Sequence, residues 1–252
     1  MNMRKPLTSV LLLLSNTTVL LTQAQYAPVA YSKWQLGAGL LATVYQGDLT
    51  PKRLGSIATS KPGFTLFTNY KLIPQLTVQA ALAISSLAGN DAVYTSPAYR
   101  RERNFKYGTP IRELSIKALY QLHKYYAADD DLLFPYVGVG IAITTLNVTK
   151  DYSSITTKLS TEQPSILSGI AADDAHGTPS ILVSLPVVVG VRKQVHTQWD
   201  VFAELNYRLT TTDYLDGFSQ AANPSKKDKY YTVAIGMIYK IKRDKGIQCP
   251  SY

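Results

Sequence analysis

The sequence predicts an all-β fold in which eight antiparallel strands follow one another up and down and close into a transmembrane barrel. Eight segments alternate apolar and polar residues, which is the period-two pattern of a two-faced strand. Long and short connections alternate between these segments, as they do when one end of a barrel carries all the short turns. The segment from Val201 to Gly217 shows the repeating unit, an alternating strand followed by a polar stretch that contains Asp213, Asp216 and Gly217.

The first four predicted strands each gather apolar side chains on one face. In the first of them, Trp34 and Leu36 fall on one face and Gln35 falls on the other. The tight turn Ile73-Pro74-Gln75 separates the second strand from the third, because proline and its neighbours favour a turn. The four predicted ranges are Lys33 to Tyr45, Gly63 to Leu72, Leu76 to Leu87 and Ile111 to Leu122.

The last four predicted strands repeat this pattern with more β-branched residues. Val187, Val189 and Val191 share one face of the sixth strand, for example, and Gly190 and Arg192 lie on the other. Their predicted ranges are Phe134 to Leu146, Ser180 to Lys193, Val201 to Thr210 and Lys229 to Lys242.

The connections predict which end of the barrel faces the periplasm. Bacterial outer-membrane barrels have short periplasmic turns and long extracellular loops, and both chain ends then lie on the periplasmic side. The predicted short or moderate turns are Ile73 to Gln75, His123 to Leu133 and Gln194 to Gln198. Four long loops are predicted. The first follows the first strand and reaches about Lys61, and the others are Ala88 to Pro110, Asn147 to Thr178 and Thr210 to Asp228.

The polar faces favour a membrane barrel over a soluble, lipocalin-like one. They consist mostly of Gly, Ala, Ser, Thr, Asn and Gln, whereas a solvent face would carry many Lys and Glu residues. Every strand also reaches the roughly 9–11 residues that a tilted membrane crossing needs. Aromatic residues near the strand ends of the apolar face are typical of interfacial girdles. They are Trp34, Tyr70, Tyr120, Trp199, Tyr207, Tyr231 and Tyr239.

The first 24 residues are typical of a secretory signal peptide. Arg4 and Lys5 precede an apolar core from Leu7 to Leu21, and Ala24 offers a small residue for cleavage. The alternative, a membrane anchor, is disfavoured because the apolar run is shorter than the roughly 20 residues of a spanning helix. The sequence therefore predicts residues 1–24 as the signal peptide. Residues 25–252 are predicted as an outer-membrane barrel with a short periplasmic tail.

A few charged residues fall on the polar strand faces and predict an ionic network inside the barrel. A structural plug of paired charges is preferred to an ion or proton path, because eight strands leave little room for a channel. Buried charges are costly unless they are paired. The predicted network is Glu113, Lys117, Arg192, Glu204 and Arg208, with Lys71 and Lys240 on the same faces.

Composition and spacing argue against several kinds of chemistry. The net charge is +9, but the basic residues are scattered through loops, so nucleic-acid binding has little support. His123, His176 and His196 have no evident Ser partner, and we expect a non-enzymatic protein without a cofactor or small-molecule substrate. An enzyme acting on lipid remains an alternative.

Acidic and cysteine residues are assigned no metal chemistry. Asp129 to Asp131, Asp173-Asp174 and the Asp213/Asp216 pair lack the spacing of a calcium loop, so we expect solvated acidic turns. The single cysteine, Cys249, excludes an intramolecular disulfide. Cys249 is either a free thiol or a contact for a periplasmic partner. Asp129 to Asp131 are also candidates for such a contact.

Several short motifs, in this order, resemble the PorG-like outer-membrane barrels over nearly the whole predicted mature chain. The last residues, Cys249-Pro250-Ser251-Tyr252, also fit this family. The motifs are Val44-Tyr45-Gln46-Gly47-Asp48-Leu49, Arg103-Asn104-Phe105, Ile111-Arg112-Glu113-Leu114, Pro135-Tyr136-Val137-Gly138, Ser160-Thr161-Glu162-Gln163, Leu185 to Val191 and Thr211-Thr212-Asp213-Tyr214-Leu215-Asp216.

The resemblance implies an eight-stranded barrel in the cell outer membrane that takes part in type IX protein secretion. Outer-membrane lipid and periplasmic ring proteins are the implied partners. The alternative is a general structural barrel like the membrane domain of OmpA, which would bind no ring. The family's loop motifs correspond here to Gly47, Asp48, Asn104, Glu162, Thr212, Asp213 and Tyr214.

Overall fold

Nine strands form in the computed structural model, which describes residues 33–123, 133–155, 161, 163–210, 212–222 and 227–241. Each long strand coincides with one of the alternating segments, because alternation lets one face meet the lumen and the other meet the surroundings. The strands are β1 (Trp34–Gln46), β2 (Lys61–Ile73), β3 (Leu76–Asn90), β4 (Lys106–Gln121), β5 (Leu133–Leu146), β6 (Thr149–Asp151), β7 (Ile181–His196), β8 (Trp199–Leu209) and β9 (Lys229–Lys240).

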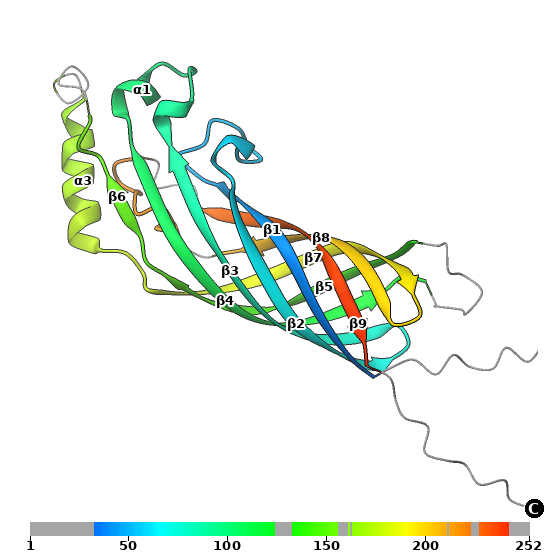
Figure 1. Cartoon of the computed structure of the whole chain (residues 1–252). Helices are drawn as coiled ribbons and strands as arrows, with labels where there is room; N and C mark the ends of the chain where they lie inside the picture. The colour runs from blue at the N-terminus through cyan, green and yellow to red at the C-terminus, as the bar shows by residue number, and fades with distance from the viewer. Residues whose placement is uncertain are drawn as a thin grey trace, which may run out of the picture. The chain divides into compact units, whose positions relative to one another are not determined.

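Eight of these strands close into a ring of antiparallel neighbours (Figure 1). Each of the strands β1 to β4 pairs with the next strand in sequence. Strand β5 then pairs with β7, β7 with β8, and β8 with β9. The ring closes where β1 pairs with β9, in a register that sets Gln35 opposite Lys240. The short strand β6 lies outside this series and pairs only with the outer end of β4. The predicted eight-stranded up-and-down barrel is therefore confirmed.

The two faces of each strand differ as the alternation predicts. On β8, Glu204 and Asn206 are buried in the lumen, whereas Leu205 points outward and is exposed. The outward side chains form a continuous apolar belt around the barrel. Its exposed members include Leu36, Leu40, Leu66, Leu82, Leu114, Ile116, Val139, Ile141, Ile143, Val183, Leu185, Val189, Leu205, Val233, Ile235 and Met237.

Such a belt is far larger than the apolar patches on the surface of a soluble monomer, so it faces the lipid bilayer. Among the described residues, no helix is long and apolar enough to cross a membrane.

The two ends of the barrel are built differently. The turns between β2 and β3 and between β7 and β8 are short and lie at one end, where β1 begins and β9 stops (Figure 1). Aromatic pairs flank this end: the rings of Trp34 and Tyr70 are 4.7 Å apart, and those of Trp199 and Tyr239 are 4.9 Å apart. We call this the periplasmic end and the opposite one the outer end, following the usual loop asymmetry.

The outer connections contain more regular structure than the sequence predicts. Helix α1 (Tyr99–Arg103) and the 3-10 turns η1 (Ile57–Thr59) and η2 (Asp91–Val93) precede strands, and helix α3 (Pro164–His176) follows β6. The segment Asn147 to Thr178 is therefore not an irregular loop. Strands β3 and β4 also reach Asn90 and Lys106, which shortens the predicted loop between them.

Some predictions concern residues outside the described part of the chain. They are the signal peptide at 1–24, the partner contacts Asp129, Asp130, Asp131 and Cys249, and the motif residue Glu162. These stay predictions.

Candidate functional site

The strongest pair inside the barrel joins β4 to β8. Glu113 and Arg208 form a bidentate ion pair, with both nitrogen–oxygen distances at 2.8 Å. Arg208 also donates to the hydroxyl of Thr232 at 2.7 Å, and the hydroxyl of Tyr230 donates to Glu113 at 2.9 Å. Both charged side chains are almost fully buried. Glu113 and Arg208 both lie on the inward, polar faces of their strands, and they meet at the same level of the lumen.

A second pair lies next to the first. The Nζ atom of Lys117 is 3.4 Å from a carboxylate oxygen of Glu204, and the hydroxyl of Tyr136 donates to the other oxygen at 3.0 Å. Gly190 makes room for this arrangement, because a Cβ there would lie 2.4 Å from the Tyr136 ring. The carboxylate of Glu204 is therefore satisfied by one cation and one hydroxyl.

A third group of charges lies toward the periplasmic end. Asp200 accepts from Lys240 at 2.6 Å and is 4.0 Å from Arg192, which also donates to Gln35 at 3.3 Å. Asp200 is absent from the predicted network, because the predicted strand begins at Val201. The alternation of Asp200, Phe202 and Glu204 is the signal that would have found it.

An apolar layer separates these charges along the lumen. The rings of Phe67 and Phe202 meet edge to face at 5.3 Å, and Leu41 and Ile238 pack beside them. The lumen is thus filled by side chains in series, as the small diameter of an eight-stranded barrel requires. Such an interior can hold the barrel rigid and gives solutes little room to pass.

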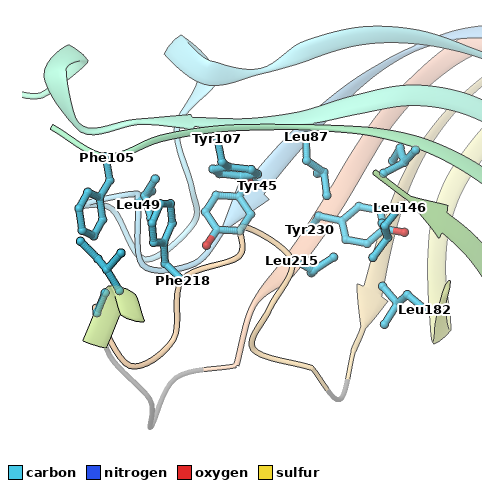
Figure 2. Packing of buried hydrophobic residues seen from close by; sticks show 13 residues of the cluster. Tyr45, Leu49, Leu87, Phe105, Tyr107, Leu146, Leu182, Leu215, Phe218 and Tyr230 are labelled. Atoms are coloured by element: carbon cyan, nitrogen blue, oxygen red, sulfur yellow. The ribbon is translucent and has the colours of Figure 1, made fainter. Parts of the chain in front are cut away.

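The outer connections fold together into an apolar core, which we call the outer cap. Its buried residues come from the outer ends of the strands, from α3 and from the segment 212–222 (Figure 2). Phe105 and Phe218 stack at 4.4 Å, and Tyr45 meets Tyr107 edge to face at 5.0 Å. The core consists of Tyr45, Leu49, Leu87, Phe105, Tyr107, Ile111, Leu146, Ile170, Leu182, Leu215, Phe218, Ala221 and Tyr230.

A buried acid pair lies at the centre of the cap, bridged by one hydroxyl. The Tyr45 oxygen is 2.6 Å from a carboxylate oxygen of Asp216 and 2.6 Å from one of Asp228. The same oxygen accepts the backbone N–H of Asp48 at 3.0 Å. A hydroxyl has only one proton to donate, so two short contacts to carboxyl oxygens require a proton on one of the two acids. The geometry therefore holds one of Asp216 and Asp228 in its neutral form.

Burial and neighbouring negative charges also favour the protonated form of these acids, because they raise the pKa of both. Burial, and then the nearby charges of Asp48 and Asp213, raise the pKa of Asp216 to about 7. Burial, followed by the charge of Asp216, raises the pKa of Asp228 well above its ordinary value. Burial and the two carboxylates also raise the pKa of the Tyr45 hydroxyl, which therefore stays protonated.

The described loop-motif residues all lie in the outer cap. A Cβ on Gly47 would fall 1.9 Å from the Tyr45 hydroxyl and 2.0 Å from Asp228, so only glycine lets the chain pass the acid pair. Asp48 is buried beside it. Asn104 ends α1 in the left-handed conformation, with φ at 50°.

The last motif, Thr212 to Tyr214, connects the cap to helix α3. The Thr212 hydroxyl accepts the N–H of Tyr214 at 3.1 Å, and the Tyr214 ring stacks on His176 at 4.1 Å. Asp213 is half-buried between them, and its charge contributes to the raised pKa of Asp216. The three motif residues thus shape a contact between two outer connections.

Two buried carboxylates hold the outer connections in place, one through an ion-pair cluster and the other through backbone N–H groups. Asp91 accepts from Arg100 at 2.9 Å and from Arg103 at 2.7 Å, and all three are buried. Asp173 of α3 accepts three backbone N–H groups, those of Ser219, Gln220 and Ala221, at 2.9 to 3.1 Å. The expected solvated acidic turns are therefore wrong for Asp173 and Asp216, because each is buried and replaces water with backbone donors.

The described part of the chain contains no group of three or more His, Cys, Asp or Glu residues that could hold a metal ion. The cap carboxylates are instead engaged by Tyr45 and by backbone N–H groups.

A closed ring, an apolar outer belt and a filled lumen define an outer-membrane β-barrel protein. The chain belongs to the family described as Domain of unknown function (DUF6089), whose model matches residues 9–240. No curated protein matches the chain.

Among solved structures, the chain is similar to small outer-membrane barrels at low identity. It covers 97% of OprG from Pseudomonas aeruginosa with 84% of its own length, at 11% identity and a TM-score of 0.46. For Neisserial surface protein A the coverage is 98% of that chain and 83% of this one, at 15% identity and a TM-score of 0.45. For Ail of Yersinia pestis, solved with the heparin analogue sucrose octasulfate, the coverage is 99% and 84%, at 12% identity and a TM-score of 0.44.

Proposed function

We propose that this protein is a non-enzymatic outer-membrane anchor of the type IX secretion machinery and that its periplasmic end docks the ring proteins of that machinery. The observation that carries the anchoring role is the filled lumen. The Glu113–Arg208 pair, the Phe67 layer and the Asp200–Lys240 pair occupy it in series. A barrel whose interior is occupied works through its two ends and its lipid face.

The place of the histidines supports a non-enzymatic role. His176 ends helix α3 and stacks on Tyr214 in the outer cap, whereas His196 ends β7 at the periplasmic end. A general base must lie within hydrogen-bond reach of the group it activates, or one water away. His123, two residues after β4, lies at the same periplasmic end as His196, so the length of the barrel separates both from His176.

The resemblance to PorG-like barrels supports the assignment to type IX secretion. Its described loop motifs converge on one folded unit, the outer cap, where Gly47 and Tyr214 have specific structural tasks. Membership of the DUF6089 family, described as a domain of unknown function, is compatible with this role and names no partner.

The periplasmic surface offers the docking site that this function needs, because ring proteins cannot reach the outer cap. It includes the turns Ile73 to Gln75 and Gln194 to Gln198. The acidic run Asp129 to Asp131 and the basic residues after Ile241 lie outside the described ranges, and we expect them to add charges of both signs at this end. Such charges steer a partner into register.

Co-purification from detergent-solubilised membranes tests the proposal. We expect the tagged protein to bring down periplasmic ring proteins. Deletion of Gly246 to Tyr252, or neutralisation of Asp129 to Asp131, should weaken this association while the barrel still assembles. The matched control removes the exposed outer-end charges with Lys52→Ala and Arg53→Ala, and it should keep the partners.

Export of type IX cargo in a deletion strain is the second readout. We expect export to be impaired. Normal export in a strain without a paralogue, together with the absence of ring proteins from the purified sample, would instead assign the chain as a general structural barrel.

A further inference from the structure

A groove of about 500 Å³ lies on the outside of the barrel wall, at the outer ends of β3 and β4. Small residues that neighbouring strands place side by side form its floor: Ala88 pairs with Gly108, and Gly108 pairs with Thr149 of β6. A Cβ added at Gly108 would meet nothing within 4 Å, so the space above the floor is open. Within these strands, Leu87 and Tyr107 point the other way, into the core of the cap.

The groove begins where the apolar belt ends. Toward the outer end of β3, the outward-facing residues after Ile84 are Ser86 and Ala88. Toward the outer end of β4, the outward-facing residue beyond Leu114 is the exposed Arg112. Ser86, Ala88 and Asn90, the partner of Lys106, lie two, four and six residues beyond Ile84, which on a tilted strand is roughly 5, 10 and 15 Å along the membrane normal. The headgroup layer extends roughly 5 to 7 Å beyond the hydrocarbon. The groove therefore begins at the level of the outer-leaflet headgroups and extends above it to Lys106.

Cationic side chains line the groove from two strands. Lys61 begins β2 and is exposed, and Lys106 begins β4. One carboxylate, that of Asp151, also lines it: it lies opposite Lys106 in the β4–β6 register, keeps its negative charge, and accepts the N–H and the hydroxyl of Ser153 at 3.0 and 2.7 Å. With Arg112 just below, this part of the surface carries more positive than negative charge.

Exposed aliphatic residues lie close to these cations. The 3-10 turn η1 contacts β1 and β3, and its Ile57, which stands four residues before Lys61, is 82% exposed. Leu54 in the same connection is 74% exposed. Cations beside exposed aliphatic side chains are the combination that binds an anionic membrane interface.

We infer that this groove binds the phosphorylated headgroup of an outer-leaflet glycolipid. Lys61 and Lys106 contact phosphate through charge-assisted hydrogen bonds, for which a flexible ammonium is well suited. The sugar of the headgroup lies over the open floor at Gly108. The acyl chains continue down the wall along Ile84 and Leu114, which belong to the lipid-facing row.

The test measures binding of fluorescent diphosphoryl lipid A to the full-length protein in nonionic detergent micelles. The double variant Lys61→Ala, Lys106→Ala should bind more weakly by roughly fivefold for each lysine, and so roughly 25-fold in total. The matched control, Lys227→Ala with Lys229→Ala, also removes two outer-end cations, but at β9 rather than at the groove, and should keep the affinity. Gly108→Leu fills the groove without changing its charge, and it should weaken binding as well.

Two further ligands distinguish the lipid from other sources of phosphate. Dephosphorylated lipid A should bind more weakly than the diphosphoryl form, and excess inorganic phosphate should fail to displace the lipid. Heat-modifiable gel mobility confirms that each variant is folded. Equal affinity of the wild type, the double variant and Gly108→Leu would overturn the inference. Complete displacement by inorganic phosphate would overturn the assignment to a lipid.

Discussion

At the scale of single residues, the hydroxyl of Tyr45 fixes the charge state of the outer cap. It is held by the Asp48 N–H on one side and by Asp216 and Asp228 on the other, so the folded cap keeps a proton that an opened cap would release. The stability of the cap is therefore linked to pH. Because the pKa of Asp216 is raised in the folded cap, the stability that this group contributes is fully present in acid and is lost as pH rises.

The first prediction concerns this linkage. Opening of the cap should increase as pH rises from the ordinary carboxyl pKa of 3.8 through about 7, the raised pKa of Asp216, and the raised pKa of Asp228 acts in the same direction. Asp216→Asn, which resembles the protonated acid, should flatten much of this dependence. Hydrogen exchange of residues 212–222 across this pH range provides the measurement. Protection that increases with pH in the wild type would contradict the proton bridge.

The second prediction concerns the ion pair in the lumen. Glu113→Gln leaves Arg208 buried without its counter-charge, so the free energy of unfolding should fall by about 3–5 kcal/mol. Replacing both partners, with Arg208→Met as the second change, should cost less than the two single changes together. Urea unfolding in lipid vesicles gives the double-mutant cycle. A coupling energy near zero would show that the two side chains do not depend on each other.

At the scale of elements, helix α3 is attached to the cap by a carboxylate rather than by a strong apolar stripe. Asp173 accepts the N–H groups of Ser219, Gln220 and Ala221, which point at it as they would at a bound anion. Ile170 adds the apolar contact. Asp173 is therefore the main buried polar attachment of the helix, beside the packing of Ile170 and the stacking of His176 on Tyr214.

The third prediction follows from that attachment. Asp173→Ala removes the acceptor of three buried N–H groups, so docking of the helix should weaken by about 1–3 kcal/mol or more. The adjacent Asp174→Ala is the matched control. Asp174 is exposed and bonds only Lys150 and Tyr152, a surface contact worth at most about 1 kcal/mol. Limited proteolysis between residues 163 and 176 should accelerate in the first variant only, and equal cleavage of both would contradict this role.

The elements that span the membrane could be predicted from the sequence because lipid on one side and a polar lumen on the other impose strict alternation. That is why the outward Leu205 and the inward Glu204 are assigned correctly. Alternation weakens above the membrane, where water touches both faces. The extensions to Asn90 and Lys106 were therefore missed, since small and polar residues such as Ala88 and Gly108 fit either environment.

The outer cap could not be predicted for a different reason. Its core joins residues far apart in sequence, such as Tyr45 and Asp228, and no local pattern encodes their contact. Helix α3 was missed because its Ser, Gly and Asp residues resemble a loop, and packing of Ile170 outweighs that weak propensity.

At the scale of the whole molecule, the outer surface of the barrel is apolar where it faces lipid.

The fourth prediction compares two exposed isoleucines. Ile116, 63% exposed, lies in the apolar belt, and Ile116→Arg should cost about 2–4 kcal/mol near the bilayer midplane. Ile57→Arg, in the outer connection, should cost far less. Urea unfolding in vesicles measures both, and equal costs would show that Ile116 does not face lipid.

The pairing of β1 with β9 has a consequence for how the chain assembles. The two strands that close the ring are the first and the last, so the ring cannot be completed until the whole chain is available. A nascent chain that ends before β9 would present unpaired backbone edges, which hydrocarbon does not tolerate. Closure is therefore a late event of high contact order, and insertion has to wait for the final twelve-residue strand.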